Sequence, residues 1–120
     1  MDDKQECLAY WVRQLGGELP LLQLPMDRPR PAVQTHRGAQ YRARYTAQSV
    51  EGLRAIGRQA GATLFMVMLA AFDVLLYRYT RQEDLVVGSV LANRTDEALE
   101  KLVGFFVNTV ALRMQVSGAV

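Results

Sequence analysis

The most constraining feature of the sequence is a long apolar run, "ATLFMVMLAAFDVLLYRY", which extends from Ala62 to Tyr79 and contains one carboxylate, Asp73. About 20 apolar residues in a row are enough to span a bilayer. A carboxylate near the middle of such a span costs on the order of 3 kcal/mol on insertion scales, and Arg78 lies inside the run as well. The run therefore predicts a helix buried inside protein and no membrane-spanning segment.

Composition and charge limit the class of protein. The 120 residues match roughly one ordinary domain, and they are 50% hydrophobic and 22% charged, which argues against a disordered chain. The net charge of +2 is too small to predict a nucleic-acid partner or an anionic membrane. Cys7 is the one cysteine, so no internal disulfide forms and a cytoplasmic location is expected. Met1 is followed by acidic residues, which is not the pattern of a signal peptide.

Helical spacing and capping residues predict four helices. The first covers residues 3–15, with Leu8, Trp11 and Leu15 on one face and glycines after it. The second begins at Ser49 as its N-cap and ends at Gly61. The apolar run forms the third, starting near Thr63. A short fourth helix covers residues 95–104, with Thr95 or Asp96 as its cap.

Three strands are predicted between these helices. Residues 39–47 alternate tyrosines, expected to face inward, with outward arginines. The continuous apolar run 84–93 predicts a strand buried on both faces, and residues 105–116 form the last strand. Two apolar strands separated by a helix predict a βαβ unit, so the fold class is α/β, a mixed sheet with flanking helices. The expected order is helix, extended connector, strand, helix, helix, strand, short helix, strand.

A proline-rich connector divides the chain. All four prolines lie within residues 17–37, where they exclude a helix interior and favour extended backbone. Several leucines at its start are expected to anchor it to a surface. The predicted divisions are an N-terminal helix at 1–16, the connector at 17–37 and a partial lobe at 38–120.

Few residues of the chain point to catalysis. His36, the one histidine, lies in the connector without nearby cysteines or carboxylates, so it favours a surface role over a metal site, which needs about four ligands. Cys7 is far from His36 in sequence, so a Cys–His pair is weakly supported. No glycine-rich phosphate-binding motif is present. We therefore assign no catalytic residue and no metal site.

Arginines in and after the connector leave three interpretations open. Interleaved with tyrosines, they could bind and stack on nucleic acid, but the small net charge favours arginines that simply face solvent. Contact with an acidic partner domain remains a third possibility. The arginines are Arg28, Arg30, Arg37, Arg42 and Arg44.

Polar residues stand at two unusual places. Asn93 and Arg94 follow a predicted apolar strand, at the end where α/β sheets tend to place sites. Asn108 and Thr109 interrupt the run "LVGFFVNTVALR". A buried amide without partners costs about 1–3 kcal/mol, so it is expected to join a hydrogen-bond network or to pin neighbouring backbone; the second interpretation is favoured.

Three stretches together resemble the condensation domains of nonribosomal peptide synthetases, within the chloramphenicol acetyltransferase-like superfamily. "LPMDRPRP" is similar to Leu-Pro-Thr-Asp-Arg-Pro-Arg-Pro, with Met26 in place of threonine. "VGSVLANR" is similar to Gly-x-Pro-x-Ala-x-Arg, with Val90 in place of proline. "LVGFFVNTVALR" is similar to Ile-Gly-x-Phe-Val-Asn-Thr-Leu-x-Leu-Arg. The resemblance runs from about Tyr10 to Met114.

This resemblance implies a two-lobed domain with a tunnel between the lobes, in which an acceptor amine attacks a donor thioester. The motif His-His-x-x-x-Asp-Gly, which the family uses for this step, is not in this sequence. The chain thus looks like the start of the second lobe, inactive alone. By resemblance, Arg94 and Asn108 brace the active site, Arg94 pairing with the motif's aspartate, while Asn93, Asn108 and Thr109 line the tunnel.

The resemblance also implies partners. These are donor and acceptor peptidyl carrier proteins, the N-terminal lobe and a neighbouring adenylation domain, with phosphopantetheine held on the carriers and no cofactor bound directly. An incomplete lobe would expose apolar edges and self-associate. Epimerising, cyclising or related acyltransferase domains remain alternatives, as does a non-catalytic interaction module.

Overall fold

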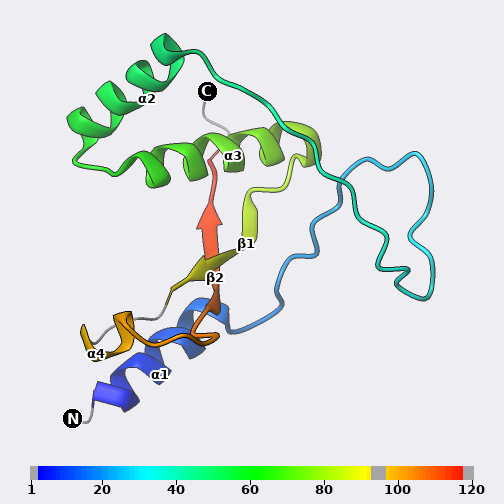
Figure 1. Ribbon diagram of the computed structural model, residues 1–120. Helices are drawn as coiled ribbons and strands as arrows, with labels where there is room; N and C mark the ends of the chain where they lie inside the picture. The colour runs from blue at the N-terminus through cyan, green and yellow to red at the C-terminus, as the bar shows by residue number, and fades with distance from the viewer. Residues whose placement is uncertain (1–2, 93–96, 118–120) are drawn as a thin grey trace. The chain divides into compact units, whose positions relative to one another are not determined.

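The computed structural model describes residues 3–92 and 97–117 (Figure 1). Contacts divide the chain into two compact units, one made of Met1–Leu22 with Gln82–Val120 and the other of Gln23–Arg81. The elements, in chain order, are α1 (Asp3–Leu15), α2 (Ala47–Ala60), α3 (Leu64–Thr80), β1 (Asp84–Leu91), α4 (Glu97–Glu100) and β2 (Asn108–Gln115). The predicted α/β class is confirmed, and α1 has the predicted bounds.

The sheet of the first unit is antiparallel. Strands β1 and β2 pair from Asp84 opposite Gln115 to Leu91 opposite Asn108. The predicted βαβ unit is therefore wrong among the described residues. The expectation rested on a helix between two apolar strands, a pattern that does not reveal strand direction, and the observed register runs antiparallel.

Burial of β1 is also lower than predicted. Leu85 is 1% exposed, but Val90 and Leu91 are 66% and 51% exposed, so burial of both faces is not observed. A strand becomes buried on both faces only when other elements cover each face. In the described part of the chain, β1 pairs with β2 alone.

The second unit contains α2 and α3, which contact each other. The N-cap of α2 lies three residues before the predicted one: Thr46 has extended backbone and its hydroxyl accepts a hydrogen bond from the Ser49 amide at 3.1 Å. Ser49 is therefore a first-turn residue, not the N-cap. Gly61 ends α2 as predicted, because its φ of 62° is one that glycine adopts without steric cost. Thr63 caps α3 by accepting from the Met66 amide at 3.3 Å.

The apolar helix α3 is much more exposed than expected. Asp73 and Leu76 are its buried residues, whereas seven of its large apolar side chains are exposed. A helix that is apolar all round needs neighbours on every side, and α2 covers one. Among the described helices none is by itself long and apolar enough to cross a membrane; α2 and α3 together reach that length and composition but bend by 104° where they join.

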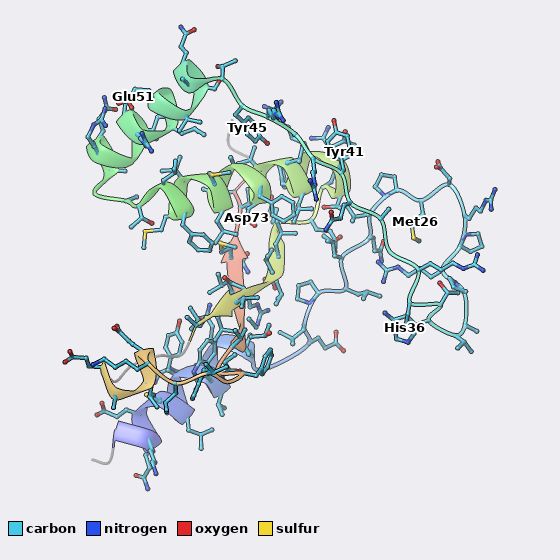
Figure 2. All side chains as sticks on the ribbon, viewed as in Figure 1. Met26, His36, Tyr41, Tyr45, Glu51 and Asp73 are labelled. Carbon is cyan, nitrogen blue, oxygen red and sulfur yellow. The ribbon has the colours of Figure 1, made fainter. Side chains whose placement is uncertain are left out.

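The predicted strand at residues 39–47 does not form. Residues 39–46 have no regular structure, and Tyr41 and Tyr45, expected to face inward, are 95% and 67% exposed (Figure 2). Alternation alone cannot form a strand, because each strand needs a neighbour to receive its backbone hydrogen bonds. The connector lacks helix and strand, as predicted, and one contact at its start is the hydrogen bond from Gln82 Nε2 to the Leu21 carbonyl, at 3.0 Å.

Candidate functional site

The polar pair Asn108 and Thr109 opens strand β2. The last strand starts at Asn108, not at Phe105, so the amide precedes the apolar strand and does not interrupt it. Both side chains are exposed, which corrects the expectation of a buried amide. Asn108 Oδ1 accepts a hydrogen bond from the Thr109 amide at 2.9 Å. This bond agrees with the interpretation in which the side chain pins neighbouring backbone.

Strand register places the end of β1 beside this pair. Leu91 lies opposite Asn108 and Val90 opposite Thr109. A Cβ atom added to Gly88 would lie 3.7 Å from the Thr109 methyl group, which is an ordinary van der Waals distance. Asn93 and Arg94 follow β1 in sequence but lie outside the described residues, as do the predicted helix caps Thr95 and Asp96. Of the predicted site residues, the structure therefore brings together Asn108 and Thr109.

An ion-pair clamp occupies the opposite end of the ladder. Arg113 Nε donates to Asp84 Oδ1 at 2.9 Å, and Arg113 Nη2 donates to Asp84 Oδ2 at 2.6 Å, a bidentate pair that joins the two strands. Arg113 Nη1 also donates to the carbonyls of Gln14 and Gly16, each at 3.2 Å. The side-chain amide of Gln14 donates a hydrogen bond from Nε2 to the Arg113 carbonyl at 3.1 Å. One guanidinium thus fastens the end of α1 to the sheet.

This clamp shifts the pKa values of Asp84 and Arg113 so that both side chains stay charged. Hydrogen bonding from Arg113, with its positive charge, lowers the pKa of Asp84 despite some desolvation. The same bond raises the pKa of Arg113. Sequence reasoning missed this network. The available signal was an arginine inside a strand predicted to be apolar, since a charge in that position needs a partner.

The carboxylate of Asp73 is the opposite case. Asp73 is 3% exposed, and its Oδ1 has no hydrogen-bond partner among the described residues. Burial raises its pKa, because desolvation disfavours the charged form. A buried carboxylate without a partner is costly to keep ionised.

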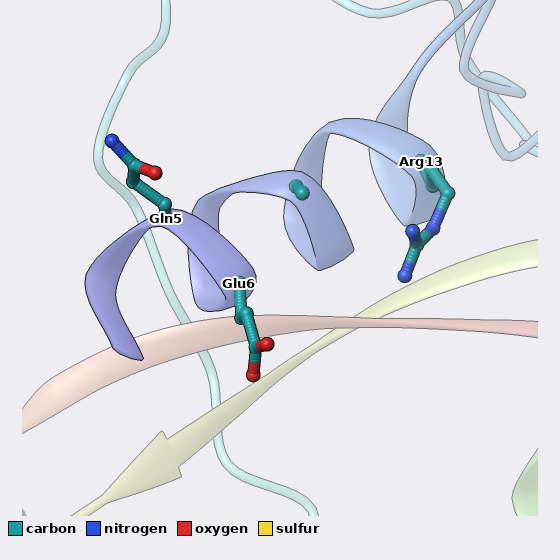
Figure 3. A pocket seen from close by; sticks show the side chains of 4 residues that line it. Gln5, Glu6 and Arg13 are labelled. Atoms are coloured by element: carbon teal, nitrogen blue, oxygen red, sulfur yellow. The ribbon is translucent and has the colours of Figure 1, made fainter. Parts of the chain in front are cut away.

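Hollows among the described residues include one along α1 and one in the connector. The first follows α1 and is lined by Gln5, Glu6, Ala9 and Arg13 (Figure 3). The second lies in the connector around His36, which is exposed. Among the described residues, no group of three or more His, Cys, Asp or Glu side chains converges in a way that could hold a metal ion.

Comparison with known proteins gives the family. The family model for the condensation domain matches residues 1–120. The chain is 53% identical over 115 residues to a linear gramicidin synthase of Brevibacillus parabrevis, covering 96% of this chain and 2% of that protein. It is 42% identical over 118 residues to phosphinothricin tripeptide synthetase PhsC of Streptomyces viridochromogenes, covering 97% of this chain and 11% of that one. The chain thus spans a small fraction of these relatives.

Solved structures agree with this match. The four-domain nonribosomal peptide synthetase holo-AB3403, bound to AMP and glycine, superposes with a TM-score of 0.89 at 33% identity, over 98% of this chain and 9% of that one. The condensation domain of the monacolin K polyketide synthase MokA superposes with a TM-score of 0.71 at 27% identity, over 92% of this chain and 27% of that one. This chain belongs to the condensation domain family.

Proposed function

We propose that this chain is part of a condensation domain that forms a peptide bond between two carrier-bound substrates. The observation that carries the proposal is the family match over residues 1–120, supported by 53% identity to a linear gramicidin synthase. In the reaction, the acceptor amine attacks the carbonyl carbon of the donor thioester. The C–S bond breaks, an amide forms, and the donor thiol is released with the proton that the amine loses.

The 120 residues do not perform this step alone. His36, the sole histidine, is exposed in the connector, and the described carboxylates form no acid–base pair around a cleft. The base belongs to the paired-histidine motif of the first lobe, which this sequence does not contain. This chain supplies positioning groups.

Four residues carry that positioning role: Asn93, Arg94, Asn108 and Thr109. Arg94 braces the first-lobe motif through a bidentate contact with its aspartate, a geometry that guanidinium groups provide and ammonium groups do not. Asn108 supports the same wall, and Asn93, Asn108 and Thr109 line the substrate tunnel. The exposed position of Asn108 and Thr109 supports this assignment, because their side chains are open to a second surface.

The remaining assignments follow from the same proposal. The partners are donor and acceptor carrier domains, whose phosphopantetheine arms hold the substrates, together with the first lobe and an adenylation domain. The cytoplasm is the predicted location, where the exposed thiol of Cys7 stays reduced.

A segment exchange tests the function. Residues 1–120 replace the matched segment of the gramicidin synthase condensation domain, and dipeptide is measured by mass spectrometry with loaded carriers. We expect dipeptide from the exchanged domain and none from the isolated 120 residues. A folded exchange protein that binds loaded carriers but forms no dipeptide would contradict the proposal. Turnover by the isolated chain would contradict its inactivity.

Substitutions at two residues of the exchanged domain separate the positioning roles. Arg94→Gln is expected to lower kcat by about 100-fold, since a small misplacement of reacting groups has that effect. Arg94→Lys keeps the positive charge but loses the two-pronged hydrogen bonding of the guanidinium group, so its kcat is expected to be lowered nearly as much. Asn108→Asp keeps the oxygen that accepts from the Thr109 amide, and it serves as the control for Asn108→Ala. Full activity of Arg94→Gln would exclude the bracing role.

A further inference from the structure

The small net charge of the chain hides a strong separation of charge between its two units. Segment Gln23–Arg81 contains nine arginines, no lysine and three carboxylates (Asp27, Glu51 and Asp73), which gives a formal charge of +6. The remaining segments, 1–22 and 82–120, contain nine carboxylates against five basic residues, which gives −4. A charge asymmetry of this size indicates a charged partner.

The arginines of the basic unit are exposed, and most have no acidic partner. All nine are exposed to solvent. Arg54 and Arg58 of α2 lie 3.8 and 2.8 Å from Glu51. Of the five in residues 23–46, Arg42 donates to the Gln40 side chain, and none has an ion pair with a described carboxylate. Five uncompensated cations with one neighbouring acid, Asp27, give this segment a formal charge of +4.

We call residues 23–46 the connector surface. Part of it encloses an open hollow of about 560 Å³, lined by two guanidinium groups, an imidazole, an amide, a hydroxyl and no carboxylate. The lining residues are Arg30, Pro31, Ala32, Gln34, Thr35, His36 and Arg37. Its charged and hydroxyl groups are those that hold a carboxylate through charge-assisted hydrogen bonds.

Large apolar and aromatic side chains are exposed on the same surface. Met26, Val33 and Tyr41 are 53%, 78% and 95% exposed, and Figure 2 shows Met26 and His36 on one open loop, with Tyr41 on the segment that leads to α2. Arginine and aromatic residues are enriched in protein interfaces, where lysine is depleted. The basic unit matches this composition, since it has nine arginines and no lysine.

From these observations we infer that the connector surface docks an acidic protein surface, one that presents Asp and Glu side chains around an apolar patch. A nucleic acid would neutralise the arginines but would leave Met26 and Val33 in contact with a polar sugar–phosphate backbone. An acidic protein surface with an apolar patch neutralises the arginines and also covers Met26 and Val33. The inference is independent of peptide-bond formation, because none of these residues belongs to the proposed tunnel wall.

The test measures binding of a fluorescent acidic amphipathic peptide, with Glu on one face and Leu on the other, to the 120-residue chain by fluorescence anisotropy. The variant Arg30→Gln/Arg37→Gln removes two cations from the hollow. The matched control Arg54→Gln/Arg58→Gln removes the same charge from α2. We expect the first variant to weaken peptide binding by about tenfold and the control by no more than about twofold, since specific charge pairs matter more than total charge. Circular dichroism checks that both variants keep the helix content of the parent.

Three outcomes would overturn the inference. Equal weakening in both variants would mean that charge alone attracts the peptide. Tighter binding of a single-stranded oligonucleotide of equal charge would identify a nucleic-acid surface. Light scattering that shows a dimer of the parent chain and a monomer of Arg30→Gln/Arg37→Gln would identify a second copy as the occupant.

Discussion

At the scale of single residues, two carboxylates show how partners decide the effect of a charge. Asp84 is held by the Arg113 guanidinium, and its pKa falls. Asp73 is 3% exposed, its Oδ1 has no partner among the residues that the structure describes, and its pKa rises. The first therefore favours the folded state at neutral pH, and the second opposes it.

Replacement of Arg113 by lysine should lower Tm by a few degrees, because lysine cannot reproduce the fork that contacts Asp84 and two carbonyls. The lowered pKa of Asp84 means that the stabilisation is present above its unfolded pKa of about 3.9 and is lost as pH falls through the folded value. Thermal melting at pH 7 and at pH 3 measures both effects.

Arg54→Lys is the control for this substitution. Arg54 is an exposed arginine, 3.8 Å from Glu51, and exchanging it should leave Tm nearly unchanged. An Arg113→Lys variant as stable as the parent at pH 7 would show that the clamp does not stabilise the sheet.

Replacement of Asp73 by asparagine should raise the free energy of unfolding by about 1–3 kcal/mol at pH 7, since it removes an unpaired buried charge. Because the pKa of Asp73 is raised, its unfavourable contribution is absent below the unfolded pKa of about 3.9, where the group is protonated in both states, and is complete once pH has risen through the folded value. The gain should therefore be small at pH 4 and larger at pH 7.

Urea unfolding of both proteins at the two pH values measures this difference. Asp27→Asn, at an exposed position in the connector, is the control and should change little. An equal gain at pH 4 and pH 7 would mean that the charge of Asp73 is not the cause.

At the scale of elements, the two inner glycines of α2 show what packing adds to helix propensity. A Cβ atom at Gly52 would meet nothing within 4 Å, whereas at Gly57 it would lie 2.7 Å from the Ala62 carbonyl oxygen. The Gly57 carbonyl also accepts a hydrogen bond from the Ala62 amide at 2.8 Å, which holds the residues after α2 close to its last turn.

Alanine at these two glycines should change the free energy of unfolding in opposite directions. Gly52→Ala should stabilise α2 by about 0.5–1 kcal/mol, the usual difference between glycine and alanine in a helix. Gly57→Ala should destabilise it by about 1–3 kcal/mol, because the added methyl group forces backbone to move. Chemical denaturation measures both, and a stabilising Gly57→Ala would contradict the close approach.

Elements differ in how far the sequence predicts them. The helices α1, α2 and α3 were predicted because spacing and caps such as Thr63 and Gly61 are local. The prediction of a strand at residues 39–47 was wrong, because an alternating pattern does not reveal whether a neighbouring strand exists. Asn108 and Thr109 stand out in the sequence as polar residues, and their role in a site stays a prediction, whereas the Asp84–Arg113 clamp depends on strand register.

At the scale of the whole molecule, the main feature is the number of large apolar side chains that are exposed. Each strand of the sheet pairs along one edge, and large side chains of α3 such as Phe65 and Phe72 are 58% and 45% exposed. Surfaces of this kind associate with other chains. The same surfaces are available to the rest of a condensation domain.

We therefore expect the isolated 120 residues to self-associate, with a mass above that of a monomer in light scattering at high concentration. Val90→Lys places a charge on β1 and should reduce association, whereas Val33→Lys, a control at another exposed position, in the connector, should not. A monodisperse monomer with a sharp melting transition would contradict this expectation.

The sequence by itself determined the helices, the α/β class and the resemblance to condensation domains, because spacing, caps and motifs are properties of neighbouring residues. Only the tertiary structure decided that β1 and β2 are antiparallel, that Arg113 clamps Asp84, that Asp73 lies buried with no described partner for Oδ1, and that residues 39–46 stay exposed. Each of these depends on which distant segments meet, and local preferences carry no information about that.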